Sequence, residues 1–158
     1  MIIVGILVLV YIFMGLIGAA LYIFNSVGLY KLAKNEDNNN AYLACVPYLN
    51  RVTEGKIAFG NNLLGITMFV LQLLSVILMC ITFFSRNMRE DSLMILSILG
   101  FILSAIFKII DFVAHYNIYS KYSKSAIIMT VLDIVSLGIL GPIFLFAIRD
   151  NELKENYK

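Results

Sequence analysis

Long uncharged runs alternate with short polar stretches along the chain. The first charged residue is Lys31, so residues 1–30 form one uncharged run, and a second lies between Lys56 and Arg86. A helix needs about 20 mostly apolar residues to cross the hydrocarbon core of a bilayer. Both runs exceed this length and predict membrane-spanning helices over about residues 2–28 and 62–85. The first run has no basic residue before it and is too long for a signal peptide, which predicts a retained helix.

Two later apolar stretches are interrupted by charged residues. Between Asp91 and Lys108 lie only 16 residues, about 24 Å of helix, so this span must continue to about Ala114. The last stretch, residues 126–148, is interrupted by Asp133. The pattern therefore predicts an all-α integral membrane bundle of four transmembrane helices in one domain, with the third and fourth over 93–114 and 126–148.

The first connection contains a short apolar segment that cannot cross a bilayer. It begins at Ala41, and Pro47 breaks any long helix through it. Residues 41–56 are predicted to lie in the membrane interface or to fold back as a re-entrant piece.

Composition supports the membrane class. Hydrophobic residues make up 61% of the chain and charged residues 14%, whereas about a quarter of an average soluble domain is charged. A soluble globule and a disordered chain are both excluded, and the first predicted partner is the lipid bilayer. The net charge of +2 gives no indication of nucleic-acid binding.

The distribution of Lys and Arg predicts the orientation. Loops 31–61 and 115–125 carry six basic residues, against five in the second loop and the C-terminal tail. Basic residues concentrate in cytoplasmic loops. Because the third loop also lacks acidic residues, we expect loops 31–61 and 115–125 to be cytoplasmic and both termini to lie outside.

Two blocks of sequence carry a resemblance. Ala41–Asn50 reads AYLACVPYLN, in which Tyr42 stands where a tryptophan is expected, and Gly141–Asp150 reads GPIFLFAIRD. They resemble segments of small, uncharacterised multi-span membrane proteins of low-GC Gram-positive bacteria. The resemblance implies a bacterial plasma-membrane protein and no particular activity.

A polar stripe follows one face of the third predicted span. Ser104, Lys108, Asp111 and His115 share this face together with Ser97. Charges inside a bilayer are costly, so the stripe should face protein or water. A turn centred near Ser120 would bring Asp133 to the depth of Lys108. We therefore predict a Lys108–Asp133 pair, with Asp111 as a competing acceptor.

The intramembrane cluster has three interpretations. The Lys–Asp pair can clamp two helices together, or Asp111, His115 and Asp133 can relay a proton or ion. A metal site is the weakest, because one histidine with carboxylates is a poor zinc set. The sequence predicts no metal and no cofactor.

Small residues and Pro142 predict close packing and bending. Gly15 and Ala19 form a small-xxx-small pair, suited to packing within the bundle or to a dimer seam. Gly138, Gly141 and Pro142 make the fourth span bendable, because Pro142 leaves the carbonyl of Gly138 unpaired. Gln72 needs a partner within the membrane, for which Ser97, Ser104 and Thr130 are candidates.

Catalytic motifs are absent from the sequence. It contains no phosphate-binding loop, HExxH, CxxC or GxSxG. We expect a non-enzymatic membrane subunit that acts through self-association or in a larger complex. The alternative is a transporter or channel that uses the polar stripe as the path of a proton, ion or small solute.

Overall fold

The computed structural model describes residues 2–84, 90–154 and 157, and every regular element in this part of the chain is helical. Three helices are long and apolar enough to cross a membrane: Gly5–Asn35, Asn62–Phe84 and Asp91–Tyr122. A shorter apolar helix follows at Ala126–Val135. The predicted all-α membrane class is therefore confirmed.

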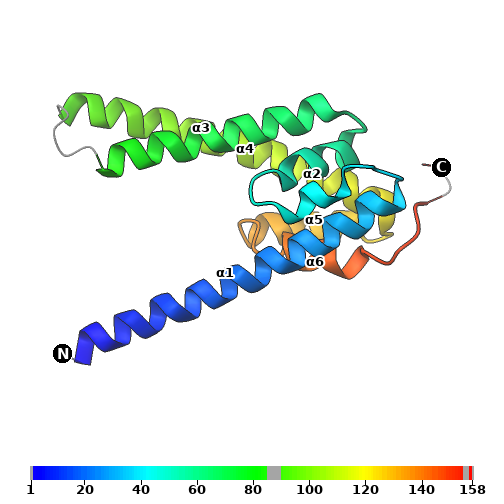
Figure 1. Ribbon diagram of the computed structural model, residues 1–158, viewed down its shortest axis with the longest axis horizontal. Helices are drawn as coiled ribbons and strands as arrows, with labels where there is room; N and C mark the ends of the chain where they lie inside the picture. Colours follow the sequence, from blue (N-terminus) through cyan, green and yellow to red (C-terminus); the bar gives the residue numbers. More distant parts are fainter. Residues whose placement is uncertain (1, 85–89, 155–156, 158) are drawn as a thin grey trace.

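The helices form a compact body from which two arms extend (Figure 1). One arm is the N-terminal half of α1 (Ile2–Asn35), and the other is the paired helices α3 (Asn62–Phe84) and α4 (Glu90–Tyr122). The body contains the C-terminal ends of α1 and α4 and four shorter elements. These are η1 (Ala41–Cys45), α2 (Asn50–Phe59), α5 (Ala126–Val135) and α6 (Gly141–Ile148).

The segment predicted to lie in the interface is built into the body. Pro47 lies between η1 and α2, where the sequence predicts a helix break. A Cβ at Gly55 of α2 would lie only 2.3 Å from the Cα of Gly65 in α3, so both glycines are needed for this crossing. Two facing glycines allow helix backbones to approach closely. The contact brings buried polar residues of α2 against α3 and α4.

The predicted fourth span is not a continuous helix. It is divided into α5 and α6, about 15 Å and 12 Å long, by a turn in which Leu137 and Gly138 have positive φ angles of 56° and 90°. Pro142 lies in the first turn of α6, where its missing N–H leaves no intrahelical bond unmade. The sequence predicted a bend at this position, and the structure has a complete break.

The two halves reverse direction, so the segment enters and leaves the same end of the molecule. Asn151, just after α6, donates to the carbonyl of Tyr122 at 2.9 Å, and Lys154 donates to the carbonyl of Ser123 at 2.7 Å. Tyr122 is the last residue of α4, and Ser123 lies in the short turn that leads to α5. Figure 1 shows the connecting turn pointing in the same direction as the two arms. The pair α5–α6 is a helical hairpin.

The small-residue face of α1 makes no contact with the rest of the chain that the structure describes. A Cβ added at Gly15 would have no heavy atom within 4 Å, and Ala19 is exposed. The packing expected for Gly15 and Ala19 within the bundle is not formed, because this half of α1 diverges from the α3–α4 pair (Figure 1). The close approach occurs instead at Gly28, where a Cβ would lie 2.8 Å from the backbone of Leu145 in α6.

Candidate functional site

Six ionisable side chains form a continuous series between α2, α4 and α5. We call this series the charge chain, and its members in spatial order are Lys108, Asp111, Arg51, Glu54, His115 and Asp133. Four of them, Lys108, Asp111, His115 and Asp133, were predicted from the sequence as members of one cluster. Asp111, His115 and Asp133 are buried.

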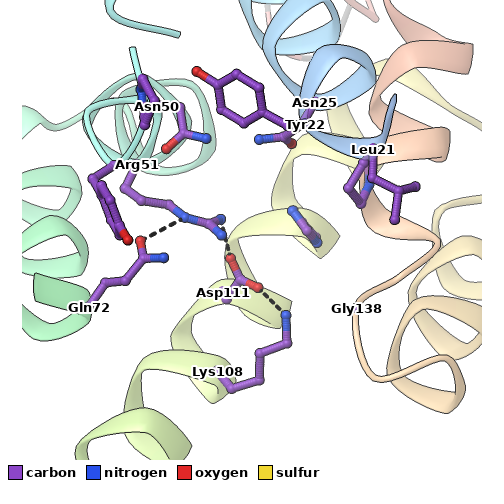
Figure 2. Close-up of a pocket in the computed structure, with 13 residues that line it drawn as sticks. Leu21, Tyr22, Asn25, Asn50, Arg51, Gln72, Lys108, Asp111 and Gly138 are labelled. Carbon is purple, nitrogen blue, oxygen red and sulfur yellow. Dashed lines mark hydrogen bonds and ion pairs between the residues drawn. The ribbon is translucent and has the colours of Figure 1, made fainter. Parts of the chain in front are cut away.

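Asp111 lies between two cations. Its Oδ2 accepts a bond from Lys108 Nζ at 2.6 Å, and its Oδ1 accepts one from Arg51 Nη1 at 2.6 Å (Figure 2). The same Arg51 nitrogen lies 2.5 Å from Oε2 of Glu54. Arg51 therefore bridges two carboxylates, while Asp111 bridges two cations.

His115 lies between the other two carboxylates. Its Nδ1 is 2.6 Å from Asp133 Oδ2, and its Nε2 is 3.4 Å from Glu54 Oε1. Tyr119 also points its hydroxyl at Asp133, 3.4 Å from the same Oδ2. The imidazole thus connects α2 to α5 through the charge chain.

The predicted Lys108–Asp133 pair is wrong. Lys108 pairs with Asp111, the acceptor predicted to compete, and Asp133 pairs with His115. The reason is the length of α4, which continues to Tyr122, so that the turn falls at residues 123–125 rather than near Ser120. His115 and Asp133 are equally far from the centre of that turn along the chain.

Arg51 and Glu54 were not predicted from the sequence as members of the site. They were assigned to an interfacial segment, in which charged residues are ordinary, and only the Gly55–Gly65 crossing brings them between the long helices. The available signal was Gln72, a mid-span amide in need of a partner. Its Oε1 accepts a bond from Arg51 Nε at 3.2 Å, and not from any of the three residues proposed as its partners.

Ser104 lies apart from the charge chain, although it was predicted to belong to the cluster. Its hydroxyl is 2.5 Å from that of Ser75, and the pair connects α3 to α4 further along the arm. The polar stripe therefore serves two purposes: Ser104 joins two helices, whereas Lys108, Asp111 and His115 join the body.

Burial and charge determine the protonation of the two α2 residues. Burial raises the pKa of the Glu54 carboxyl, and the attraction of Arg51 opposes this rise. Burial alone would lower the pKa of Arg51, but Glu54 and Asp111 raise it above its ordinary value. A carboxylate as deeply buried as Glu54 needs positive partners in order to stay ionised.

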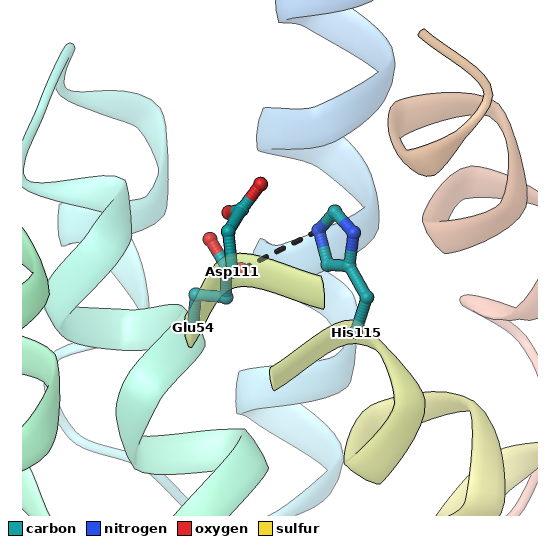
Figure 3. A group of neighbouring side chains, drawn as sticks. All are labelled: Glu54, Asp111 and His115. Atoms are coloured by element: carbon teal, nitrogen blue, oxygen red, sulfur yellow. Dashed lines mark ion pairs between the residues drawn. The ribbon is translucent and has the colours of Figure 1, made fainter. Parts of the chain in front are cut away.

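Glu54, Asp111 and His115 each place a potential metal-ligating atom within 4.8 Å of the others (Figure 3). However, Arg51 and Lys108 already engage Glu54 Oε2 and both oxygens of Asp111. Glu54 Oε1 and His115 Nε2 are therefore the two potential metal-ligating atoms of this group that have no hydrogen-bond partner among the described residues. Two donors are fewer than the three or four protein ligands of a typical zinc site.

An open pocket of about 390 Å³ adjoins the charge chain (Figure 2). Its wall includes polar residues of α1 and α2, four members of the charge chain, the α5–α6 turn and the start of α6. These residues are Asn25, Asn50, Arg51, Lys108, Asp111, His115, Gly138 and Pro142. Lys108 keeps 36% of its side chain exposed, so the charge chain is not sealed off.

The glycines of the hairpin lie against the charge chain. A Cβ at Gly138 would lie 2.2 Å from Lys108 Nζ, and one at Gly141 would lie 2.6 Å from Cε1 of His115 and 3.0 Å from Oδ1 of Asp133. Gly138, Gly141 and Pro142 were predicted as packing or bending positions. The structure places all three beside ionisable groups or on the pocket wall.

Comparison with known proteins gives no match, whether to family models, to curated sequences or to solved structures.

Proposed function

We propose that the protein is a non-enzymatic membrane transport protein that binds a proton, an ion or a small polar solute beside the charge chain. The observation that carries this proposal is the α5–α6 hairpin, whose unwound turn lies against Lys108 at an open pocket. Non-helical backbone at membrane depth is tolerated where it is buried in protein or lines a water-filled cavity. Broken helices of this kind form the binding sites of many transporters.

The open pocket at the Lys108 end of the charge chain favours transport over a purely structural clamp. A clamp needs only one well-sealed ion pair, because each buried charge must be compensated. Here six ionisable groups are gathered, and Arg51, Lys108, Asp111 and His115 all line a pocket large enough for a small solute. Intramembrane charges arranged in this way mark ion and substrate pathways.

We also propose that the chain crosses the membrane three times, with the body at the cytoplasmic side of a bacterial plasma membrane. The hairpin begins and ends at the same end of the molecule, which leaves α1, α3 and α4 as the spans. Eight basic residues then share the side of the body: Lys31, Lys34, Arg51, Lys56, Lys121, Lys124, Arg149 and Lys154. Only Arg86 and Arg89 lie between α3 and α4 in the sequence. Such an excess is typical of the cytoplasmic side.

The second candidate function is that of a subunit within a homo- or hetero-oligomeric membrane complex. It is favoured by the N-terminal half of α1, in which residues 5–20 are all exposed. A single chain with three spans also has little room for a complete pore, so transport itself would use a path shared between copies or a moving carrier. The two candidates are therefore compatible.

Flux measurements test the transport proposal. The purified protein is reconstituted into liposomes that contain a pH-sensitive dye, and gradients of protons, sodium or potassium are imposed. We expect flux above that of empty liposomes, and loss of that flux in Asp133→Asn, which keeps the shape of the side chain. The matched control is Asp150→Asn, because Asp150 is an exposed carboxylate outside the site. Wild-type protein that is folded but passes none of these ions, nor small polar solutes, would contradict the proposal.

Native mass spectrometry of gently extracted protein tests the second candidate. A closed homo-oligomer or a stoichiometric second protein is expected if α1 serves association. A protein that transports as a monomer would contradict the subunit function, and the remaining function would be that of a carrier.

A further inference from the structure

The order of charges along the charge chain is incomplete without a proton. Lys108, Asp111, Arg51 and Glu54 alternate in sign, and Asp133 ends the series as a second carboxylate beyond His115. Resting on the proposed transport function, we infer that His115 holds a proton as an imidazolium between Glu54 and Asp133, and that this proton is the transported or coupling ion.

The balance of charge requires one further positive group. With all three carboxylates ionised, Glu54, Asp111 and Asp133 contribute three negative charges, whereas Arg51 and Lys108 contribute two positive ones. Asp111 and Asp133 are 1% and 0% exposed, so water does little to compensate the remaining charge. An unpaired charge away from water is among the most costly features that a protein can contain. A proton on His115 makes the set neutral.

The geometry provides a place for that proton. Asp133 Oδ2 lies 2.6 Å from His115 Nδ1, a short contact typical of a hydrogen bond that involves a charged partner. On the other side, His115 Nε2 and Glu54 Oε1 are both buried, have no hydrogen-bond partner among the described residues, and lie 3.4 Å apart. An imidazolium donates from both nitrogens, whereas a neutral imidazole donates from only one. Protonation therefore gives both unpaired atoms a partner.

The other groups around His115 favour the same state. From α2 it faces Glu54 and, behind it, Arg51; from α4 it faces Asp111 and the ring of Tyr119; from α5 it faces Asp133. The contact from α6 is the uncharged backbone of Gly141. The nearest groups are thus carboxylates on two sides. The two permanent cations are already occupied by Glu54 and Asp111.

The proton also has a route. His115 lines the open pocket together with Lys108, Asp111 and the α5–α6 turn. A proton can therefore pass between the pocket and the buried Glu54–His115–Asp133 series without rearrangement of the long helices. Loss of the proton leaves two carboxylates facing a neutral ring. We expect the hairpin to move when the proton is lost, because Gly141 of α6 lies against both His115 and Asp133.

His115 is the only histidine, so a single labelled residue reports on the inference. The full chain, labelled with ¹⁵N in the imidazole ring, is placed in lipid nanodiscs at pH 7 and examined by NMR. We expect both ring nitrogens to show the chemical shifts and N–H couplings of an imidazolium. One protonated and one unprotonated nitrogen in the folded wild-type protein would overturn the inference without the need for any variant.

Variants identify the partners. Glu54→Gln should lose the second N–H signal, because the ring no longer faces a carboxylate at Nε2, whereas Asp150→Asn should leave the spectrum unchanged. An unchanged imidazolium in Glu54→Gln would overturn the role of Glu54. Addition of zinc alone should not shift the wild-type signals; a saturable shift would show that the site takes a metal instead of a proton.

The same samples separate this inference from the transport proposal. An imidazolium together with proton flux that is lost in Glu54→Gln supports both. Flux of another ion or solute past a neutral ring would overturn the proton site and keep transport. An imidazolium in a protein that passes nothing would keep the proton site, overturn its role as the transported ion and contradict transport.

Discussion

Asp111 is the residue on which the two cations of the site depend. It is 1% exposed and accepts bonds from both Arg51 and Lys108, and its own helix supplies only one of them. The second cation comes from α2, so the carboxylate also holds α2 against α4. Its neighbours would lose a charged partner if it were neutralised.

We therefore predict that Asp111→Asn destabilises the folded protein by about 3–5 kcal/mol, the cost of breaking a buried ion pair on one side. Thermal unfolding in detergent, followed by circular dichroism, measures this change. Asp150→Asn is the control, because its carboxylate and its Lys31 partner are both exposed. Equal melting temperatures of the two variants would show that Asp111 does not stabilise the fold.

The Gly55–Gly65 crossing leads to a second prediction, on the stability effect of one added methyl group. A methyl group at residue 55 would lie 2.3 Å from the Cα of Gly65, where no flexible side chain can yield. Gly55→Ala should destabilise the protein by about 1–3 kcal/mol, as overpacking usually does. Gly15→Ala adds the same methyl group where no atom lies within 4 Å, and it should not destabilise the fold. The difference in midpoint between the two variants is the measured quantity.

Individual charges were harder to place from the sequence than the helices that carry them. The cost of charges in a membrane identified Lys108, Asp111, His115 and Asp133 as a group. Their pairing depended on where α4 ends, and a shift of the turn by about one helical turn changed each partner. Arg51 was not identified, because its own segment gives no sign that a glycine crossing will bury it, and its partner Gln72 was assigned to other side chains.

At the scale of elements, the hairpin is shaped by glycines that lie against the site. Gly138 has φ of 90°, a conformation that residues with a side chain adopt only with strain. The same position lies against Lys108 Nζ. The turn is therefore fixed in shape and in its distance from the charge chain by the same residue.

Gly138→Ala should thus cost about 1–3 kcal/mol through backbone strain and also displace Lys108 from Asp111. We expect ion flux in liposomes to fall more than the loss of folded protein explains. Gly100→Ala is the matched control, since a Cβ there meets Leu78 at 3.5 Å, an ordinary contact within the α3–α4 arm. A flux that follows only the amount of folded protein in both variants would argue against a functional turn.

The end of α6 is tied to α1 by a titratable pair. Lys31 donates to Asp150 at 2.6 Å, and this bond lowers the pKa of the Asp150 carboxyl below its ordinary value of 3.8. A lowered pKa means that the pair contributes above pH 3.8 and that its contribution is lost as the pH falls through the lower, folded value.

Amide hydrogen exchange around Asn151 should therefore show protection above pH 3.8 that weakens as the solution becomes more acidic than this. Exchange rates are corrected for their intrinsic dependence on pH. Asp150→Asn should remove the step and leave the rest of the profile intact. A step of the same size in the variant would assign it to another group.

The sequence indicates where the hairpin breaks, but not that the chain reverses its direction there. Gly138 and Pro142 indicated a weak point in the fourth stretch, and the structure has its break there. Whether the chain continues or reverses after such a point is decided by what the second half contacts. Here α6 lies along α1, with the backbone of Leu145 against Gly28. A contact of this kind depends on residues more than 100 positions apart, which local patterns do not contain.

At the scale of the whole molecule, the reversal changes the orientation argument. Counting four spans divided the basic residues almost evenly between the two sides. With three spans, the C-terminal tail joins the side of the body, and the excess up to Lys154 becomes eight against two. A stronger charge asymmetry arises from the same sequence once the path of the chain is known. This agreement between path and charge is independent support for the three-span topology.

Accessibility of single cysteines distinguishes the two topologies. In a chain with Cys45 and Cys80 replaced by serine, a cysteine is introduced by Ser125→Cys, Tyr157→Cys or Asn87→Cys, and intact cells are treated with a membrane-impermeant thiol reagent. Three spans place positions 125 and 157 on the same side, so both are protected, whereas position 87 reacts. Four spans place 157 with 87, because the chain would cross once more after 125. Labelling of position 157 together with position 87 would thus contradict the re-entrant hairpin and, with it, the main support for transport.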